Sequence, residues 1–259
     1  MPYADVNGIR LNYSSEGKGV PIILLTGFSN DIGFWKKAVG MLSDKYKVIC
    51  LDNRGAGKTV YEGKFSIDDL GDDVVSLMDH LNISSAHILG WSMGSHIAQN
   101  VAIRYPEKVT TLTLVSSYHF RPARSGHMLR SMINALDGGM PPEFFSHVLI
   151  GLCNSESFFE RKEKSNTPIK PVKLPNVDSL RAQLDAVDGY DTTKTASSIS
   201  CPTLSIHGTE DIMVDCGLGD ALAKSIKNCK VLRVEGAGHV IDPRFYISVF
   251  IDHVDEHPF

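Results

Sequence analysis

The sequence predicts a doubly wound α/β fold, in which a mostly parallel sheet of about eight strands carries helices on both faces. Six short runs are rich in β-branched residues and almost wholly apolar, as strands buried on both faces of a parallel sheet are. Segments with helical periodicity separate most of these runs. A third observation is a serine between two glycines, Gly90-Trp91-Ser92-Met93-Gly94, at one strand-to-helix junction.

The first element is an antiparallel pair, because Asn7-Gly8 lies between two strand-like runs and is a strong hairpin signal. The parallel strands are predicted in order at residues 22–26, 48–51, 86–89, 111–115, 203–206 and 231–234. The helices are predicted at residues 35–42, 67–81, 95–105, 218–226 and 243–254. Ser66 and Asp69 form a capping box at the start of the second of these helices.

Residues 118–191 break this alternation. Helical pieces at 127–136, 143–152 and 179–187 surround a polar, proline-rich stretch at 162–175. The sequence therefore predicts a core domain formed by residues 1–117 and 192–259, with a helical insertion at 118–191 after the sixth strand.

Ser92 is the candidate nucleophile. A sharp turn from strand to helix strains the residue at its corner, and Gly90 and Gly94 remove the Cβ atoms that would clash there. The hydroxyl then stands at a helix N-terminus, where amide dipoles favour developing negative charge. The alternative is a tight connection that a serine merely caps.

A nucleophilic serine needs a base and a carboxylate to orient it. Asp211 follows the run at 203–206, and His239 follows the run at 231–234. Since parallel strands end at one edge of a sheet, loops after three strands can bring these side chains to Ser92. Glu210 or Asp215 could instead be the acid. His239 could simply cap the loop before residues 242–243.

Five short segments occur in a fixed order along the chain, at residues 26–28, 52–57, 90–94, 207–211 and 236–239. In this order they resemble the α/β-hydrolase family over nearly the whole chain. Residues 52–57, 90–94 and 97–99 are most similar to its 3-oxoadipate enol-lactonase-like and small carboxylesterase members. The resemblance implies a Ser92, Asp211 and His239 triad, and a cap, or lid, formed by residues 118–191. Relatives that open epoxides or displace halide carry aspartate at the nucleophile, so Ser92 favours acyl chemistry.

The oxyanion of such a reaction needs two donors, and the candidates are the backbone N–H groups of Phe28 and Met93. The family often has histidine where Thr26 stands. A main-chain donor survives that difference.

Three functions fit these residues. The first is a serine hydrolase that cleaves a small carboxylic ester or lactone through an acyl-enzyme. The second is a C–C bond hydrolase of vinylogous keto acids with the same triad, and the third is a slow-turnover ligand-sensing signalling protein. Candidate substrate-binding residues are Trp91, beside the nucleophile, and the polar side chains His119, Arg121 and Arg124. Either arginine could bind a substrate carboxylate.

Composition excludes several other classes. The net charge of -4 and the lack of a dense Lys/Arg run give no reason to expect nucleic acid or membrane partners. Five cysteines with no C-x-x-C pair, and no leader-like or membrane-spanning run, indicate reduced thiols and a cytoplasmic protein. We expect a monomer or homodimer with a small-molecule substrate, no cofactor and, since no His/Asp/Glu cluster has metal spacing, no metal.

Residues 55–59 mimic the end of a phosphate-binding loop, but Asp52 stands where that motif needs glycine.

Overall fold

The described part of the chain, residues 2–258 of a computed structural model, contains one sheet of eight strands in the order β1-β2-β4-β3-β5-β6-β7-β8. The pairs β1·β2 and β2·β4 are antiparallel, and all other neighbours are parallel. The predicted fold class is confirmed. The strands are β1 (Tyr3–Val6), β2 (Ile9–Glu16), β3 (Pro21–Leu25), β4 (Lys47–Leu51), β5 (Ala86–Trp91), β6 (Val109–Val115), β7 (Thr203–Gly208) and β8 (Cys229–Val234).

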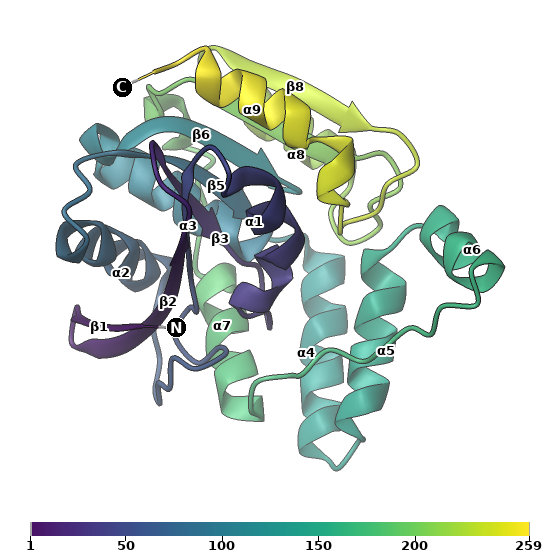
Figure 1. The fold of residues 1–259 in the computed structure, drawn as a ribbon. Coiled ribbons are helices and arrows are strands. Elements are labelled where there is room, and N and C mark those ends of the chain that lie inside the picture. The colour runs from purple at the N-terminus through teal and green to yellow at the C-terminus, as the bar shows by residue number, and fades with distance from the viewer. Residues whose placement is uncertain (1, 259) are drawn as a thin grey trace.

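Helices cover both faces of this sheet (Figure 1). One apolar core lies between the sheet and α2, α3 and α8, and a second lies between the opposite face and α1 and α9. Strand β3 shows why two cores form, because Ile23 and Leu25 join the first while Ile22 and Leu24 join the second. These helices are α1 (Lys36–Leu42), α2 (Ile67–His80), α3 (Met93–Arg104), α8 (Cys216–Ser225) and α9 (Ile247–Asp255).

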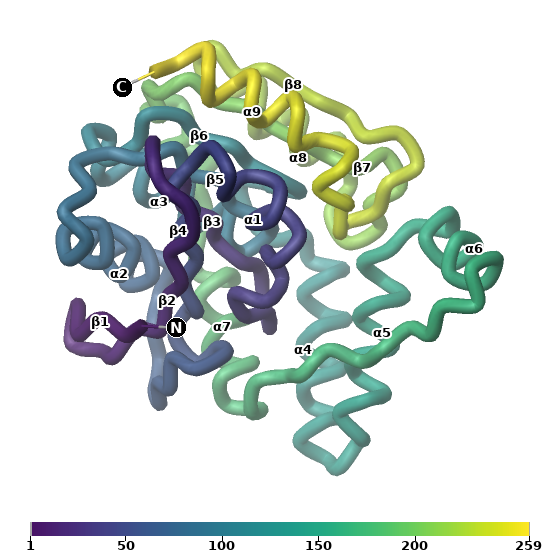
Figure 2. The backbone as a smooth tube through the Cα atoms, in the orientation of Figure 1, coloured from purple at the N-terminus to yellow at the C-terminus, as the bar shows by residue number. Residues whose placement is uncertain are grey.

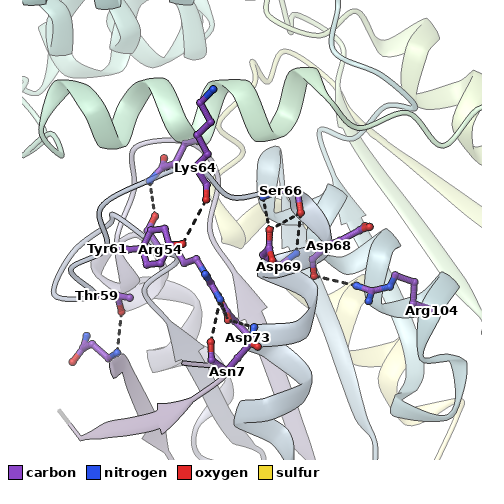
Figure 3. Close-up of polar contacts among 12 residues, drawn as sticks. Asn7, Arg54, Thr59, Tyr61, Lys64, Ser66, Asp68, Asp69, Asp73 and Arg104 are labelled. Atoms are coloured by element: carbon purple, nitrogen blue, oxygen red, sulfur yellow. Dashed lines mark hydrogen bonds and ion pairs between the residues drawn. The ribbon is translucent and has the colours of Figure 1, made fainter. Parts of the chain in front are cut away.

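Helix α2 begins at the predicted capping box, in which Ser66 and Asp69 cap each other's backbone N–H groups. Just beside it, Asp73 of α2 forms a two-bond ion pair with Arg54, at 2.7 and 2.8 Å. Asn7 of the β1–β2 turn donates to the same carboxylate at 2.8 Å (Figure 3). The ion pair therefore fastens the hairpin and the segment after β4 to α2.

The phosphate-loop mimic is a structural turn around Asp52. This buried carboxylate accepts hydrogen bonds from the Asn12 side chain at 2.7 Å and from the Lys58 and Ile32 N–H groups at 2.8 Å. Gly57 lies at φ +53, and a Cβ there would lie 2.2 Å from Asp52 Oδ2. The glycine thus serves the close approach to a carboxylate, which leaves no room for a phosphate.

Between β6 and β7 the chain forms four α-helices. We call residues 118–191, which contain them, the α4–α7 segment (Figure 2). Apolar side chains of α4, α5 and α7 form a third core with Met213 and Val214. The two ends of the segment meet, because Phe120 and Asp191 form an antiparallel bridge and the Thr192 N–H donates to the His119 carbonyl at 3.0 Å. The helices are α4 (Ala123–Asp137), α5 (Pro142–Cys153), α6 (Glu156–Lys164) and α7 (Val177–Asp188).

Helix α6 was absent from the sequence prediction, which assigned no element to residues 153–161. It is short and has no buried residue, so it lacks the apolar stripe on which helix prediction depends. In Figures 1 and 2 it lies at the far end of the α4–α7 segment, and an extended stretch runs back from it past α5 and α4 to α7.

The five cysteines are free thiols. Burial raises the pKa of Cys50 to about 12, so that thiol is inert at neutral pH. Within residues 2–258 no helix combines the length and the apolar character that crossing a bilayer requires.

Candidate active site

Ser92 stands at the corner between β5, which ends at Trp91, and α3, which begins at Met93. Its backbone is strained, with φ 53 and ψ -119. A Cβ on Gly90 would lie 2.2 Å from the Gly94 carbonyl oxygen, and one on Gly94 would lie 2.1 Å from the Leu25 carbonyl oxygen. Both glycines are therefore required by close backbone approaches, and helix α3 starts two residues before its predicted position.

The structure brings together Ser92, Asp211 and His239, which come from the ends of three different strands. His239 Nε2 lies 2.9 Å from Ser92 Oγ, and His239 Nδ1 lies 2.7 Å from Asp211 Oδ2. All three residues are buried, with 9%, 6% and 4% of their surfaces exposed for Ser92, Asp211 and His239. The imidazole can therefore take a proton from the hydroxyl while the carboxylate holds its other nitrogen.

Asp211 is held as a carboxylate by its surroundings. Its Oδ1 accepts the N–H groups of Met213 and Val214, both at 2.9 Å. Burial alone would raise its pKa, but the charge of His239 and hydrogen bonds from His207, His239 and Val214 outweigh burial and bring the pKa below its ordinary value. Neither rival acid takes this place: Asp215 caps α8 through the Gly217 N–H, and the carboxylate that bonds His239 Nδ1 is that of Asp211 and not of Glu210.

The backbone of His239 is fixed from two sides. The Trp91 indole N–H donates to the His239 carbonyl at 2.8 Å, and the Ser116 hydroxyl donates to the same oxygen at 2.9 Å. The Trp91 ring also stacks on Phe34, with centroids 4.3 Å apart. Trp91, which precedes Ser92 in the sequence, thus positions His239 next to Ser92.

The loop after β3 passes directly over the nucleophile. A Cβ on Gly27 would lie 2.7 Å from the Trp91 ring and 3.1 Å from Ser92 Cβ. The N–H of Met93 belongs to the first helical residue of α3 and has no partner within the helix. With the Phe28 N–H in the adjoining loop, these are the two donors that the sequence predicts for the oxyanion.

Two buried amide side chains hold this loop. The Asn53 side-chain amide donates to the Thr26 carbonyl at 3.2 Å. Gln183 of α7 accepts the Ser29 N–H at 2.9 Å, and its own amide donates to the Arg54 carbonyl at 3.4 Å. Ser29 has φ 64, so the loop is fixed in a conformation that few side chains adopt. The role of Gln183 was not predicted, since nothing in a helical stretch marks which glutamine reaches a distant loop.

A pocket of about 550 Å³ opens onto Ser92 and His239. Its walls are chiefly apolar and come from the loop after β3, from α4, α5 and α6, and from residues 167–172. Trp91, a predicted substrate-binding residue, lines it. Lys162 and Lys170 also line it, and sequence reasoning missed both because it read their stretch only as a polar linker.

Within residues 2–258 the other predicted substrate-binding residues do not line this pocket, but Arg121 lines a small cavity that Ser92 and His239 also line. His119 is near Thr192 and Ser225, at 3.3 and 3.4 Å, and Arg124 donates to the Ile212 carbonyl at 2.7 Å; neither lines the pocket in the described chain. Arg121 borders a small adjoining cavity of about 30 Å³, but its guanidinium is paired with Asp188. The guanidinium groups of Arg121 and Arg124 are thus occupied by protein groups, which the sequence could not reveal.

The structure corrects one premise of the metal prediction. His253, Glu256 and His257 of the α9 end place their ligand atoms within 4.8 Å of one another, so a His/Glu cluster with metal spacing does exist. The i, i+3, i+4 pattern was the overlooked signal. Glu256 is paired with Lys230 at 2.6 Å. The cluster lies at the opposite edge of the sheet from Ser92. Asp255, which neighbours the cluster, bonds Tyr46 just before β4 begins, whereas Ser92 follows the end of the parallel strand β5.

Comparisons with known proteins agree with this fold. A family model described as alpha/beta hydrolase fold matches residues 20–241. A proposed carbamate hydrolase, RutD from Azorhizobium caulinodans, is 24% identical over 92% of this chain and 91% of its own. The 3-oxoadipate enol-lactonase 2 of Acinetobacter baylyi is 37% identical over 42% of each chain. The crystal structure of the enol-lactonase from Burkholderia xenovorans superposes with a TM-score of 0.84, at 24% identity and 99% coverage of both chains.

Proposed function

Since the chain belongs to the alpha/beta hydrolase fold family, we propose that it is a serine hydrolase that cleaves a small carboxylic ester or lactone through an acyl-enzyme. The observation that carries the proposal is the continuous hydrogen-bonded line from Ser92 Oγ through His239 to Asp211, at 2.9 and 2.7 Å. The likeness to enol-lactonases supports the choice of a carboxylic ester or lactone among acyl substrates.

In this mechanism Ser92 Oγ attacks the substrate carbonyl carbon while His239 Nε2 takes the hydroxyl proton. Asp211 stabilises the resulting imidazolium, and its lowered pKa keeps it ionised for that task. The tetrahedral intermediate collapses when His239 returns the proton to the departing alcohol or enol oxygen. A water then attacks the acyl-enzyme by the same route, and Ser92 leaves with the proton that His239 took from the water.

The oxyanion of both tetrahedral intermediates is assigned to the N–H groups of Phe28 and Met93. Removing one donor of this kind costs about 3 kcal/mol in the barrier. Gly27 supports the assignment, because its contacts with Trp91 and Ser92 bring the Phe28 peptide next to the nucleophile.

We further propose that the α4–α7 segment acts as the cap. It supplies much of the pocket wall, including Leu129, Leu149 and Phe158. Such a cover excludes water from the acyl-enzyme and selects the substrate by shape.

The test is turnover of p-nitrophenyl esters and small lactones in substrate excess, with Ser92→Ala as the variant. We expect steady turnover that the variant abolishes, together with labelling of the native protein, but not the variant, by a fluorophosphonate. Release of one equivalent of product per protein, with no further turnover, would refute the proposed enzymatic activity and favour a ligand-sensing role. Turnover of vinylogous keto acids with none of the esters would replace ester cleavage by C–C bond hydrolysis.

A further inference from the structure

The pocket has two chemically different ends. The reacting end holds Ser92, His239 and Phe28. The other end lies toward α6, which Figure 1 shows away from the sheet, and toward residues 167–172, which return from α6 toward α7. A substrate that fills the pocket therefore places its scissile carbonyl at the first end and another part of the molecule at the second.

The charge at the second end has one sign. Lys162 and Lys170 are the lysine and arginine side chains that line the pocket in the described chain, and no aspartate or glutamate is among its lining residues. Apolar side chains, among them Phe34, Ile150 and Val240, make up most of the remaining lining. Low-dielectric walls concentrate the field of these two cations along the pocket.

Neither lysine has an acidic partner within residues 2–258, whereas Lys164 on the same helix pairs with Glu160 at 3.3 Å. The Lys162 ammonium lies 5.7 Å from the centroid of the Phe158 ring, which also lines the pocket. A cation–π contact of this kind holds the Lys162 amine against the pocket wall. Two lysines without an acidic partner, Lys162 partly buried and Lys170 exposed, line one cavity and leave a place for an anion.

We infer that the natural substrate carries a carboxylate at the end remote from the scissile bond, and that Lys162 and Lys170 receive it. This inference rests on the proposed ester or lactone hydrolysis and names its substrate class. The carboxylate gains the attraction of two ammonium groups, while the apolar middle of the substrate contacts the walls. Lys162 and Lys170 bind and orient; the reacting atoms remain those of Ser92 and His239.

The experiment compares two p-nitrophenyl esters of equal length, one ending in a carboxylate and one in the corresponding primary amide. We expect the wild type to prefer the acid ester through a lower KM, and 0.5 M NaCl, a chosen assay condition, to reduce that preference. In Lys162→Met/Lys170→Met, KM for the acid ester should rise roughly tenfold, equivalent to about 1.4 kcal/mol. KM for the amide ester should stay within about twofold, well below the expected tenfold effect. Lys162→Arg/Lys170→Arg should keep the preference.

Lys173→Met is the matched control, because Lys173 lies on the same stretch but lines a different hollow. It should leave both KM values unchanged. Equal KM values for the two esters in the wild type, or equal changes in the double Met variant, would overturn the inference while leaving ester hydrolysis intact.

A binding measurement separates the two proposals. Calorimetry on Ser92→Ala with glutarate and with its monoamide needs no turnover, and tighter glutarate binding that the double Met change abolishes would support the anion site even if no ester is hydrolysed. Failure of all esters with equal weak binding of both compounds would overturn the anion site and the proposed function together.

Discussion

Replacing Gln183 by leucine tests whether the α4–α7 segment fixes the oxyanion loop. Gln183 is fully buried, and its Oε1 accepts the N–H of Ser29, the residue after Phe28. Without that acceptor the buried Ser29 N–H loses its partner, at a cost of about 1–3 kcal/mol. The loop can recover part of this cost by moving, which displaces the Phe28 N–H.

The expected rate loss follows from two limits. Complete loss of one oxyanion donor costs about 2.7–4 kcal/mol, and a displaced donor keeps part of its effect. We therefore expect kcat to fall roughly tenfold, about 1.4 kcal/mol. KM should hardly change, since Gln183 does not line the described substrate pocket.

Steady-state kinetics on a neutral p-nitrophenyl ester measures both constants, and the affinity of a trifluoromethyl ketone, an oxyanion mimic, should fall in parallel with kcat. Gln183→Glu keeps an acceptor oxygen and should recover most of kcat. Arg181→Met, on the exposed side of the same helix where it pairs with Asp137, is the matched control. A Gln183→Leu protein that folds and retains kcat within about twofold would refute the reasoning, because a tenfold loss is predicted.

Three further outcomes are expected. Asp73→Ala leaves the buried Arg54 guanidinium without its partner, so the free energy of unfolding in urea should fall by about 3–5 kcal/mol; a loss close to that of an exposed ion pair would contradict this account. The folded pKa of Asp211 lies below its unfolded value, so its stabilising contribution is complete above about pH 4 and is lost as pH falls through the folded pKa. We therefore expect the free energy of unfolding in urea to fall more steeply between pH 5 and pH 3, a chosen assay range, for the wild type than for Asp211→Asn. Equal slopes would argue against this account. Gly94→Ala puts a Cβ 2.1 Å from the Leu25 carbonyl oxygen, and we expect soluble protein and ester turnover to be lost together; a folded, active variant would contradict the need for glycine.

The sequence predicted the fold, and it predicted that Ser92, Asp211 and His239 would meet, because both follow from local patterns. Buried parallel strands are continuous apolar runs, and Ser92 and Asp211 each follow such a run, β5 and β7. His239 follows β8, which was expected to be buried on both faces but is an edge strand with mostly exposed side chains. Strand order then brings the three loops to one edge of the sheet. The required glycines, Gly90 and Gly94, were visible for the same reason, since they flank the serine in sequence.

The pocket was predicted poorly because its lining depends on packing between segments. Arg124 and Lys170 are both cations between β6 and β7, and the chain gives no sign that one binds the Ile212 carbonyl while the other faces the cavity. Arg121 is similarly neutralised by Asp188, which lies far along the chain. Gln183 is invisible for a related reason: a single long-range hydrogen bond leaves no periodic trace in the sequence.

The bridge between Phe120 and Asp191 has a consequence for how this chain can change over evolution or by engineering. Because the α4–α7 segment leaves and re-enters the core at one point, it can be exchanged like a cassette with little disturbance to the sheet. Gln183, however, reaches from this cassette to the loop beside the nucleophile. A grafted replacement must therefore bring its own hydrogen-bond acceptor for Ser29, so substrate range can diverge only among inserts that preserve this one polar connection.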